Sequence, residues 1–202
     1  MENISQTNRL LLRPIDWMLD FNRLIAIEKQ SFKSPWNAER FGLFAATPGN
    51  IALAAELDGV LVGYMLCQKQ QKRAGKVIHI AHIAVDPLVR SHGIGSALIA
   101  SLLANLRNEQ VTLHVRLSNN KAQALYERLG FFIDAHLPEH YSDGEEALLM
   151  KYTPDQLAPS LPLLTCAATK ESRLGQRQRL HRRYARPAFS PVGKLVGSVE
   201  NS

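Results

Sequence analysis

The sequence is poor in cysteine, with only Cys67 and Cys166 among its 202 residues. Two cysteines give neither a disulfide framework nor the paired spacing of a metal site, so we expect no metal. Long apolar runs are also missing, which argues against a membrane-spanning helix of about 20 residues. Polar residues are scattered through residues 1–17, so we expect no apolar signal segment there. These absences predict a cytoplasmic protein with no membrane partner.

Charge is distributed unevenly along the chain, whose net charge is +6. Residues 1–157 carry 16 basic and 16 acidic side chains, whereas residues 158–202 carry eight basic and two acidic ones. We therefore predict a domain over residues 1–153 and a basic, Pro-containing tail over residues 154–202 that is disordered. This tail either makes weak RNA or ribosome contacts or is a solvated extension without a partner.

Apolar periodicity and turn signals predict an α+β protein with a mixed sheet. Asp58-Gly59 between two apolar runs predicts a β-hairpin. Asp16 and Asn37 are placed to cap the first two helices, and residues 68–76 form a polar connection. The expected strands are residues 8–13, 50–57, 60–69, 77–85, 111–117, 131–135 and 147–152, and the expected helices are residues 17–30, 38–46, 95–108 and 120–129.

The strand over residues 77–85 runs into a polar segment with the spacing Arg90-x-x-Gly93-x-Gly95, after which a helix begins. The first amides of a helix lack intrahelical partners and carry the positive end of the helix dipole. Gly93 and Gly95 would let a ligand's phosphates approach the backbone, and Arg90 adds positive charge at the rim. The segment lacks the spacing of a dinucleotide fold and the Lys-Ser/Thr of a nucleoside-triphosphate loop. It predicts either another kind of anion site or a strand–helix junction without a ligand.

Two segments resemble signatures of the GNAT acetyltransferases, a family that uses acetyl-CoA. The Arg90-x-x-Gly93-x-Gly95 spacing after Ile-Ala-Val-Asp-Pro is similar to the family's pyrophosphate-binding signature. In the stretch of residues 114–131, the strand end Val115-Arg116-x-Ser118 is followed by Asn-x-x-Ala-x-x-Leu-Tyr-x-x-x-Gly-Phe, which begins at Asn119. This second pattern resembles N-terminal acetyltransferases of the ribosomal-protein alanine type, and the resemblance covers about residues 8–152.

The resemblance implies a GNAT fold, in which helices flank a mixed central sheet and two parallel strands splay apart to admit acetyl-CoA as co-substrate. It also implies a set of cofactor-binding residues drawn from both signatures. For Asn119, a helix N-cap is an alternative explanation. The implied cofactor set is Ile83, Ala84, Val85, Arg90, Ser91, His92, Gly93, Ile94, Gly95, Ser96 and Asn119.

The resemblance also implies two catalytic residues. Tyr126 matches the tyrosine that protonates the leaving sulfur, and a phenol with a pKa of about 10 is protonated at neutral pH. His114 stands where many members of this type have Glu and others have His. An imidazole with a pKa of about 6.5 can take a proton, often through a water molecule. The alternatives are a Leu-Tyr pair that packs a helix and a histidine satisfied within the core.

Two further histidines, His79 and His82, lie three residues apart on one predicted strand. Side chains at this spacing face opposite ways unless a β-bulge intervenes. We expect His82, which is nearer the glycine turn, to line the acetyl site. His79 is expected to be structural.

The substrate follows in part from amine chemistry. An α-amino group has a pKa of about 7.8 and a lysine about 10.4, so roughly a quarter of the first but about one part in a thousand of the second is neutral at physiological pH. A single modest base therefore suits a protein N-terminus, and the resemblance implies the same substrate, a ribosomal protein included. It places the peptide against Phe32, Pro35, Trp36 and Tyr141, although the aromatic loop could equally form a lid over the core.

We therefore expect direct attack of the amine on acetyl-CoA in a ternary complex. Two other functions stay open at this point. One is a GNAT acetyltransferase that acts on a lysine or a small-molecule amine. The other is a CoA-binding or RNA-binding module without activity.

Overall fold

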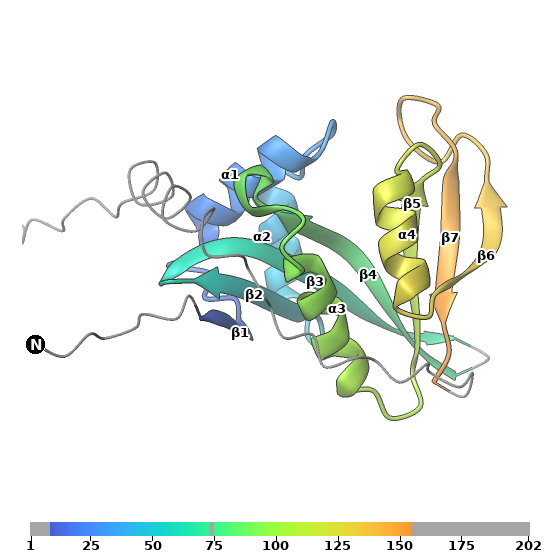
Figure 1. Cartoon of the computed structure of the whole chain (residues 1–202), viewed down its shortest axis with the longest axis horizontal. Helices are drawn as coiled ribbons and strands as arrows, with labels where there is room; N and C mark the ends of the chain where they lie inside the picture. The colour runs from blue at the N-terminus through green and yellow to red at the C-terminus, as the bar shows by residue number, and fades with distance from the viewer. Residues whose placement is uncertain (1–8, 73–74, 155–202) are drawn as a thin grey trace, which may run out of the picture. The chain divides into compact units, whose positions relative to one another are not determined.

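The structure, a computed structural model, describes residues 9–72 and 75–154, which belong to the first of the chain's two units, Met1–Ala168. The described residues form a seven-stranded sheet in the order β1-β2-β3-β4-β5-β7-β6 (Figure 1). Neighbouring strands are antiparallel except β4 and β5, which are parallel. The predicted mixed sheet is thus confirmed. The strands are β1 (Leu10–Pro14), β2 (Ile51–Leu57), β3 (Val60–Lys72), β4 (Gly75–Val85), β5 (Gln110–Arg116), β6 (Phe132–Leu137) and β7 (Ala147–Tyr152).

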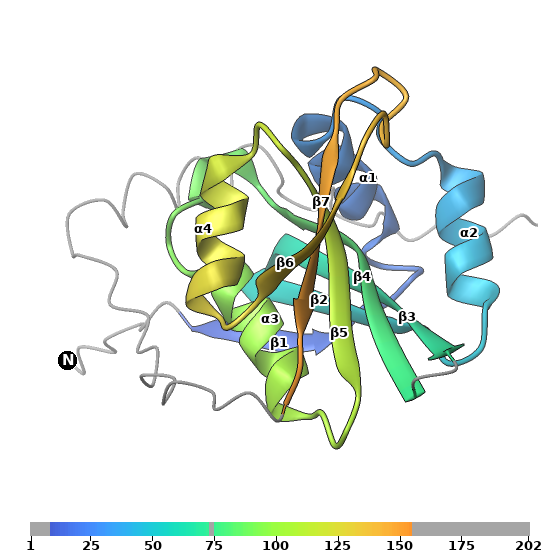
Figure 2. The ribbon, with the colours of Figure 1, turned by 90° about the vertical axis from the view of Figure 1, so that its right-hand side faces the viewer.

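Helices cover both faces of the sheet. They are α1 (Phe21–Ser31), α2 (Ala38–Ala46), a short 3-10 helix η1 (Pro87–Val89), α3 (Ile94–Ala104) and α4 (Asn120–Arg128). Helices α1 and α2 lie on one face, and α3 and α4 lie on the other (Figures 1 and 2). On the α1/α2 face, Leu24 and Phe41 from the helices pack with Tyr64 and Leu66 of β3 in one buried cluster. The burial of such apolar side chains is the main force that holds the helices on the sheet.

Helix α1 begins at Phe21, whereas the sequence predicted a start at residue 17. Asp16 does not cap the helix, because its carboxylate accepts the amides two and three residues further on and closes a separate turn. Asp20, directly before the helix, accepts two hydrogen bonds from the Arg13 guanidinium at 2.6 and 2.8 Å. The helix therefore begins after the turn that Asp16 closes, and the residue directly before it is bound to β1.

Two other boundaries differ from the prediction by three residues or more. Helix α3 ends at Ala104 because the Asn105 side chain donates to the carbonyl of Ser101 at 2.8 Å and so competes with the helical pattern. The polar connection predicted over residues 68–76 is mostly wrong, since β3 continues to Lys72 and β4 begins at Gly75. Backbone pairing between these two strands extends beyond their apolar part.

Helix α2 agrees with the prediction, and the Asn37 side chain accepts the amide of Arg40 at 2.9 Å as its N-cap. Apart from Pro154, the predictions for the tail lie outside the described residues. None of the helices in the described part of the chain has the length and apolarity needed to cross a membrane.

Candidate active site

Strands β4 and β5 separate in the middle of the sheet. Their parallel pairing joins residues 77–80 to residues 110–113, but β4 continues to Val85 and β5 to Arg116. Figure 1 shows the strands diverging beyond the paired segment. The predicted splaying is confirmed. It leaves facing backbone edges at which a ligand can form hydrogen bonds.

A glycine in the left-handed region joins this opening to α3. Gly93 has φ +79° and lies directly before Ile94, the first residue of α3, whose start has no side-chain cap. Ser91 in the same turn has φ +64°. Gly95 differs, because a Cβ placed there would lie at an ordinary contact distance of 3.5 Å from Leu125 of α4. The backbone conformation therefore favours a glycine at the first position, whereas at the second neither the backbone nor the packing requires one.

The rest of the predicted cofactor set, except Asn119, surrounds this turn. Arg90 donates from Nε to the carbonyl of Val85 and from Nη2 to the hydroxyl of Ser31, both at 3.0 Å. Its guanidinium thus joins the end of β4 to the end of α1. The His92 ring lies with Nδ1 2.7 Å from the carbonyl oxygen of Arg90. The residues brought together here are Ile83, Ala84, Val85, Arg90, Ser91, His92, Gly93, Ile94, Gly95 and Ser96.

Asn119 and Tyr126 both belong to the second signature, on and before α4. The Asn119 carboxamide oxygen accepts the amide of Ala122 at 3.2 Å, so the N-cap interpretation accounts for its position. Tyr126 is buried, and its ring centroid lies 5.9 Å from that of Phe131. Burial, with a smaller contribution from Tyr141, raises the pKa of Tyr126, so the phenol keeps its proton.

His114 lies on β5, directly after the last residue that pairs with β4. Its ring centroid is 4.9 Å from that of His79 and 4.4 Å from that of His140. Burial and these two neighbouring histidines lower the pKa of His114 to about 4. The imidazole is therefore neutral at physiological pH and has a lone pair to offer. Within residues 9–72 and 75–154, no three His, Cys, Asp or Glu side chains are grouped to hold a metal ion.

A β-bulge in β4 turns His79 and His82 to the same face of the sheet. His79 pairs with Gln68 and His82 with Leu66. Residues two apart on a strand share a face, and directly paired residues of antiparallel strands do too. Ala81 is the extra residue, which reverses the alternation expected for a regular strand. His79, expected to be structural, has Nδ1 3.1 Å from a threonine hydroxyl of β5.

The predicted peptide-binding residues occupy two loops. Phe32 and Trp36, between α1 and α2, pack on His82 with centroid distances of 4.7 and 4.2 Å. Pro35 in the same loop is exposed. Tyr141, between β6 and β7, has the Arg116 guanidinium 3.9 Å from its ring centroid. The two loops therefore present aromatic side chains from distant parts of the sequence.

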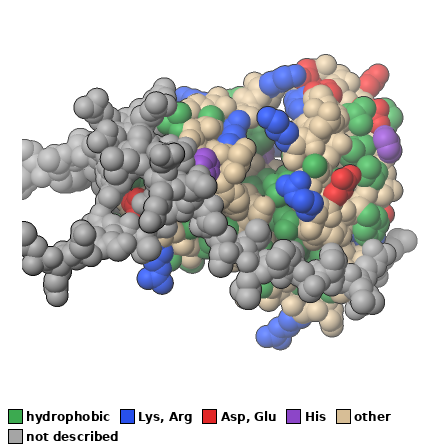
Figure 3. Space-filling model, in the orientation of Figure 1, with side chains coloured by type: hydrophobic (Ala, Val, Ile, Leu, Met, Phe, Trp, Pro, Cys, Tyr) green, Lys and Arg blue, Asp and Glu red, His purple; other side chains and the backbone are tan. Residues whose placement is uncertain are grey.

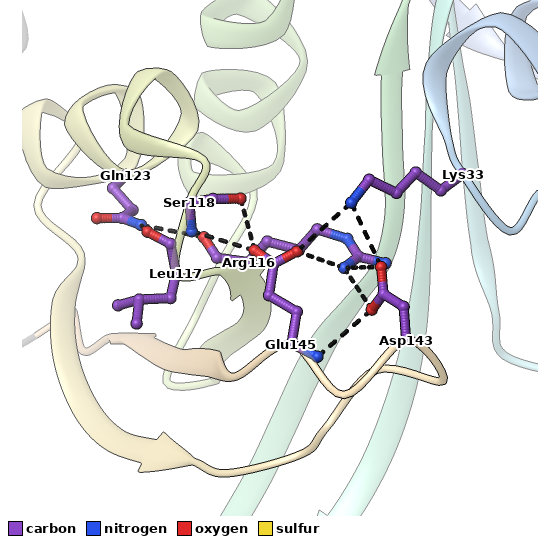
Figure 4. Close-up of polar contacts among 7 residues, drawn as sticks. All are labelled: Lys33, Arg116, Leu117, Ser118, Gln123, Asp143 and Glu145. Atoms are coloured by element: carbon purple, nitrogen blue, oxygen red, sulfur yellow. Dashed lines mark hydrogen bonds and ion pairs between the residues drawn. The ribbon is translucent and has the colours of Figure 1, made fainter.

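An ionic cluster that the sequence analysis did not identify joins these two loops (Figure 4). Lys33 Nζ lies 3.4 Å from Asp143 Oδ2 and 3.9 Å from Glu145 Oε2. Arg116, at the end of β5, donates to the same two carboxylates at 2.9 and 2.6 Å. The Arg116 hydrogen bond lowers the pKa of Asp143 to about 2. The acidic pair was visible in the sequence, but its two cationic partners are far from it along the chain.

Glu28 is a second residue that the sequence analysis missed. It is fully buried, accepts the Trp36 amide at 2.7 Å and the Tyr64 hydroxyl, and lies 3.4 Å from Nδ1 of His82. Burial opposes its ionisation, but His82, Tyr64 and the Trp36 amide together hold the pKa of Glu28 below its ordinary value. The sequence did contain one sign that Glu28 is buried. It lies four residues after Leu24, within the apolar stripe of α1.

Comparison with known proteins gives consistent matches. The acetyltransferase (GNAT) family profile matches residues 21–131. The chain is 34% identical over 145 residues to an uncharacterised N-acetyltransferase of Methanocaldococcus jannaschii, covering 69% of this chain and 90% of that protein. It is 32% identical over 139 residues to a putative ribosomal protein bS18-alanine N-acetyltransferase of Bacillus subtilis, covering 66% and 89%. The crystal structure of the ribosomal-protein-S18-alanine N-acetyltransferase from Escherichia coli shares the fold, with a TM-score of 0.64 at 24% identity over 76% of this chain and 99% of that one.

Proposed function

The chain belongs to the acetyltransferase (GNAT) family, and from this premise we propose that it acetylates the N-terminal α-amine of a protein, such as a ribosomal protein. The observation that carries the proposal is the opening between β4 and β5. The glycine turn and the start of α3 follow the end of β4. His114 lies on β5, directly after the last residue that pairs with β4. The loops that bear Phe32, Trp36 and Tyr141 supply the remaining surface for a peptide.

Acetyl-CoA is the co-substrate of this acetyltransferase family. The uncapped amides at the start of α3 suit its pyrophosphate, and Arg90 adds a guanidinium to the same turn. Packing leaves room for a Cβ at residue 95. The glycine found there leaves the backbone bare, which gives a phosphate close access. Lys and Arg side chains lie around the middle of the described surface on the α3/α4 face (Figure 3), where they favour an anionic ligand. Residues 83–85 offer the strand edge along which the amide-bearing arm of CoA would pair.

The reaction needs one proton acceptor and one proton donor. The neutral amine attacks the thioester carbonyl carbon, the C–N bond forms, and the C–S bond breaks without a covalent enzyme intermediate. His114 receives the proton that leaves the amine, directly or through a water molecule. Tyr126, whose buried phenol keeps its proton, gives that proton to the departing thiolate.

The pKa of His114 bears on the class of amine. A base with a pKa of about 4 drives proton removal weakly, so it suits an amine that is already partly neutral. An α-amine with a pKa of about 7.8 meets that condition far better than a lysine with a pKa of about 10.4. The name of the Bacillus subtilis relative, a putative ribosomal protein bS18-alanine N-acetyltransferase, supports the same choice.

The test is release of free thiol from acetyl-CoA in the presence of peptides that start with Ala, Ser, Gly or Met-Leu. We expect turnover on one of these classes, and a fall of about 10²-fold or more in His114→Ala and Tyr126→Phe. His136→Ala, an exposed histidine on β6 paired with Glu146, serves as the matched control and is expected to keep the wild-type rate.

A second set of peptides separates the other outcomes. Each active peptide is compared with a version that has a blocked N-terminus and carries a lysine. Faster acetylation of the blocked peptide would identify a lysine or small-amine acetyltransferase. Binding of acetyl-CoA without turnover on any amine would instead identify a non-catalytic module.

A further inference from the structure

We propose that His82, positioned by the buried carboxylate of Glu28, is a second proton acceptor at the acetyl-transfer site. This inference rests on the proposed function and adds a residue pair to it. His82 and Glu28 come from β4 and α1, and the two side chains meet beside the opening between β4 and β5. The pair differs from His114 in having a carboxylate behind the ring.

The strand register places His82 beside the opening. The last β4 residue that pairs with β5 is Ile80, opposite Leu113. His82 follows it across the bulge on β4, and His114 follows Leu113 on β5. The bulge turns His82 to the face that bears His79, and the His79 ring lies 4.9 Å from that of His114. The two strands therefore present a histidine each on the same face, where they part.

The contact with Glu28 determines which nitrogen of His82 can accept a proton. Nδ1 is buried, makes no hydrogen bond within the described residues, and lies 3.4 Å from Glu28 Oε2, the carboxylate oxygen it faces. An ionised carboxylate only accepts hydrogen bonds, so the tautomer that suits this contact carries its hydrogen on Nδ1. Nε2 then holds the free lone pair. The side chain is 14% exposed.

The surroundings of the pair favour this role over a purely packed histidine. Phe32 and Trp36 enclose the ring from the loop that we assign to the peptide. Glu28 is itself held by the Trp36 amide and the Tyr64 hydroxyl, which keep the carboxylate ionised and oriented. A carboxylate beside one ring nitrogen orients an imidazole and selects its tautomer. Among the charged and titratable groups around His82, Glu28 of α1 lies against the ring, and Tyr64 of β3 binds Glu28. His79 of β4 and His114 of β5 lie on the same face of the sheet as His82.

The proposed step is a simple proton transfer. The ammonium of the substrate loses one N–H proton to Nε2 of His82, directly or through a water molecule, and becomes the nucleophilic amine. The imidazolium so formed keeps its Nδ1 hydrogen toward Glu28, and solvent removes the Nε2 proton after turnover. His82 differs from His114 in this step because a carboxylate beside its other nitrogen orients the ring.

The experiment combines a pH profile of the kinetics with NMR of the His82 ring nitrogens, which reports the tautomer of the ring, and it uses the full chain. The variants are His82→Gln and Glu28→Gln, with His136→Gln as the matched control, since that exposed histidine also faces a carboxylate, Glu146, at 2.7 Å. The Glu28→Gln variant keeps an oxygen that can accept the Trp36 amide. Thermal unfolding confirms that each variant is folded before kinetics are compared.

We expect His82→Gln to lower kcat/KM at least tenfold and His136→Gln to leave it within about twofold. In Glu28→Gln the ring nitrogen shifts of His82 should show a loss of the Nδ1–H tautomer, and kcat should fall while the KM for the peptide stays within about twofold, because the carboxylate orients the ring and does not bind the substrate. A folded His82→Gln variant with the wild-type rate and pH profile would overturn this inference. In that case the activity of the wild type would still uphold the proposed function. A Glu28→Gln variant that keeps the wild-type kcat, or that loses activity while the His82 tautomer is unchanged, would overturn the pairing of the two side chains. Wild type that acetylates no peptide would overturn both proposals.

Discussion

The backbone amide of Trp36 donates to the buried carboxylate of Glu28 at 2.7 Å, so a charge on α1 fixes the loop that follows this helix. The folded-state pKa of Glu28 is below its ordinary value of 4.5. Its contribution to stability is therefore fully present above about pH 4.5 and is lost as the pH falls through the lower folded-state value. Glu28→Gln should lower the free energy of unfolding at pH 7 by about 1–3 kcal/mol and weaken the loss of stability in acid.

Urea unfolding of wild type and Glu28→Gln at pH 7 and in mild acid measures both effects. The exposed Glu127 of α4 provides the matched Glu→Gln control, with a change expected to stay within about 0.5 kcal/mol. Equal acid sensitivity in wild type and Glu28→Gln would show that other carboxylates account for the acid response.

The ion pair between Lys33 and Asp143 connects the two loops that flank the proposed peptide site. The Lys33 side chain is 71% exposed, so the interaction is weak and sensitive to salt. Lys33→Met should raise the KM for peptide about two- to fivefold with little change in kcat, because binding must then order the loops without this contact. Peptide KM measured at low and high salt tests this, with the exposed Lys29 changed to Met as control. A difference between variant and wild type that persists undiminished at about 1 M salt would contradict the electrostatic account.

The two glycines of the turn should respond differently to alanine. Gly93 has φ +79°, so Gly93→Ala should cost about 1–2 kcal/mol of stability. Gly95 has room for a Cβ at 3.5 Å from Leu125, and a helix favours Ala over Gly, so Gly95→Ala should leave stability unchanged or slightly higher. It should nevertheless raise the KM for acetyl-CoA if a phosphate approaches that backbone. Thermal unfolding and acetyl-CoA saturation curves measure the two effects, and an unchanged KM in Gly95→Ala would place the pyrophosphate elsewhere.

Tyr126→Phe removes the proposed proton donor while keeping the buried ring. We expect kcat to fall about 10²-fold. Because burial raises the pKa of Tyr126, the phenol is protonated throughout the working range, and the loss should be the same at every pH from about 6 to 9. Steady-state rates across that range, with thermal unfolding as a check on folding, decide the point. A loss confined to alkaline pH would instead point to a role for the phenolate.

Local signals in the sequence were sufficient for much of this protein. The Asp58-Gly59 hairpin, the Asn37 cap of α2, the order of the elements and the glycine turn all depend on neighbouring residues, and the structure agrees with each. His114 and Tyr126 emerged from a motif in one continuous segment, and their catalytic roles stay predictions. Local reading failed at the start of α1, where the Asp16 carboxylate closes a separate turn and the helix begins only at Phe21.

Tertiary structure alone decided the contacts around the opening. The bulge that turns His82 toward Glu28 is a property of the β3–β4 register, which no single strand encodes. Lys33 and Asp143 are brought together only when two loops meet across the sheet. The sequence by itself determined the backbone elements and the chemistry that each residue can offer, because propensity, capping and turn signals act over a few residues. The fold decided which of those groups meet, because pairing and packing join residues that are far apart along the chain.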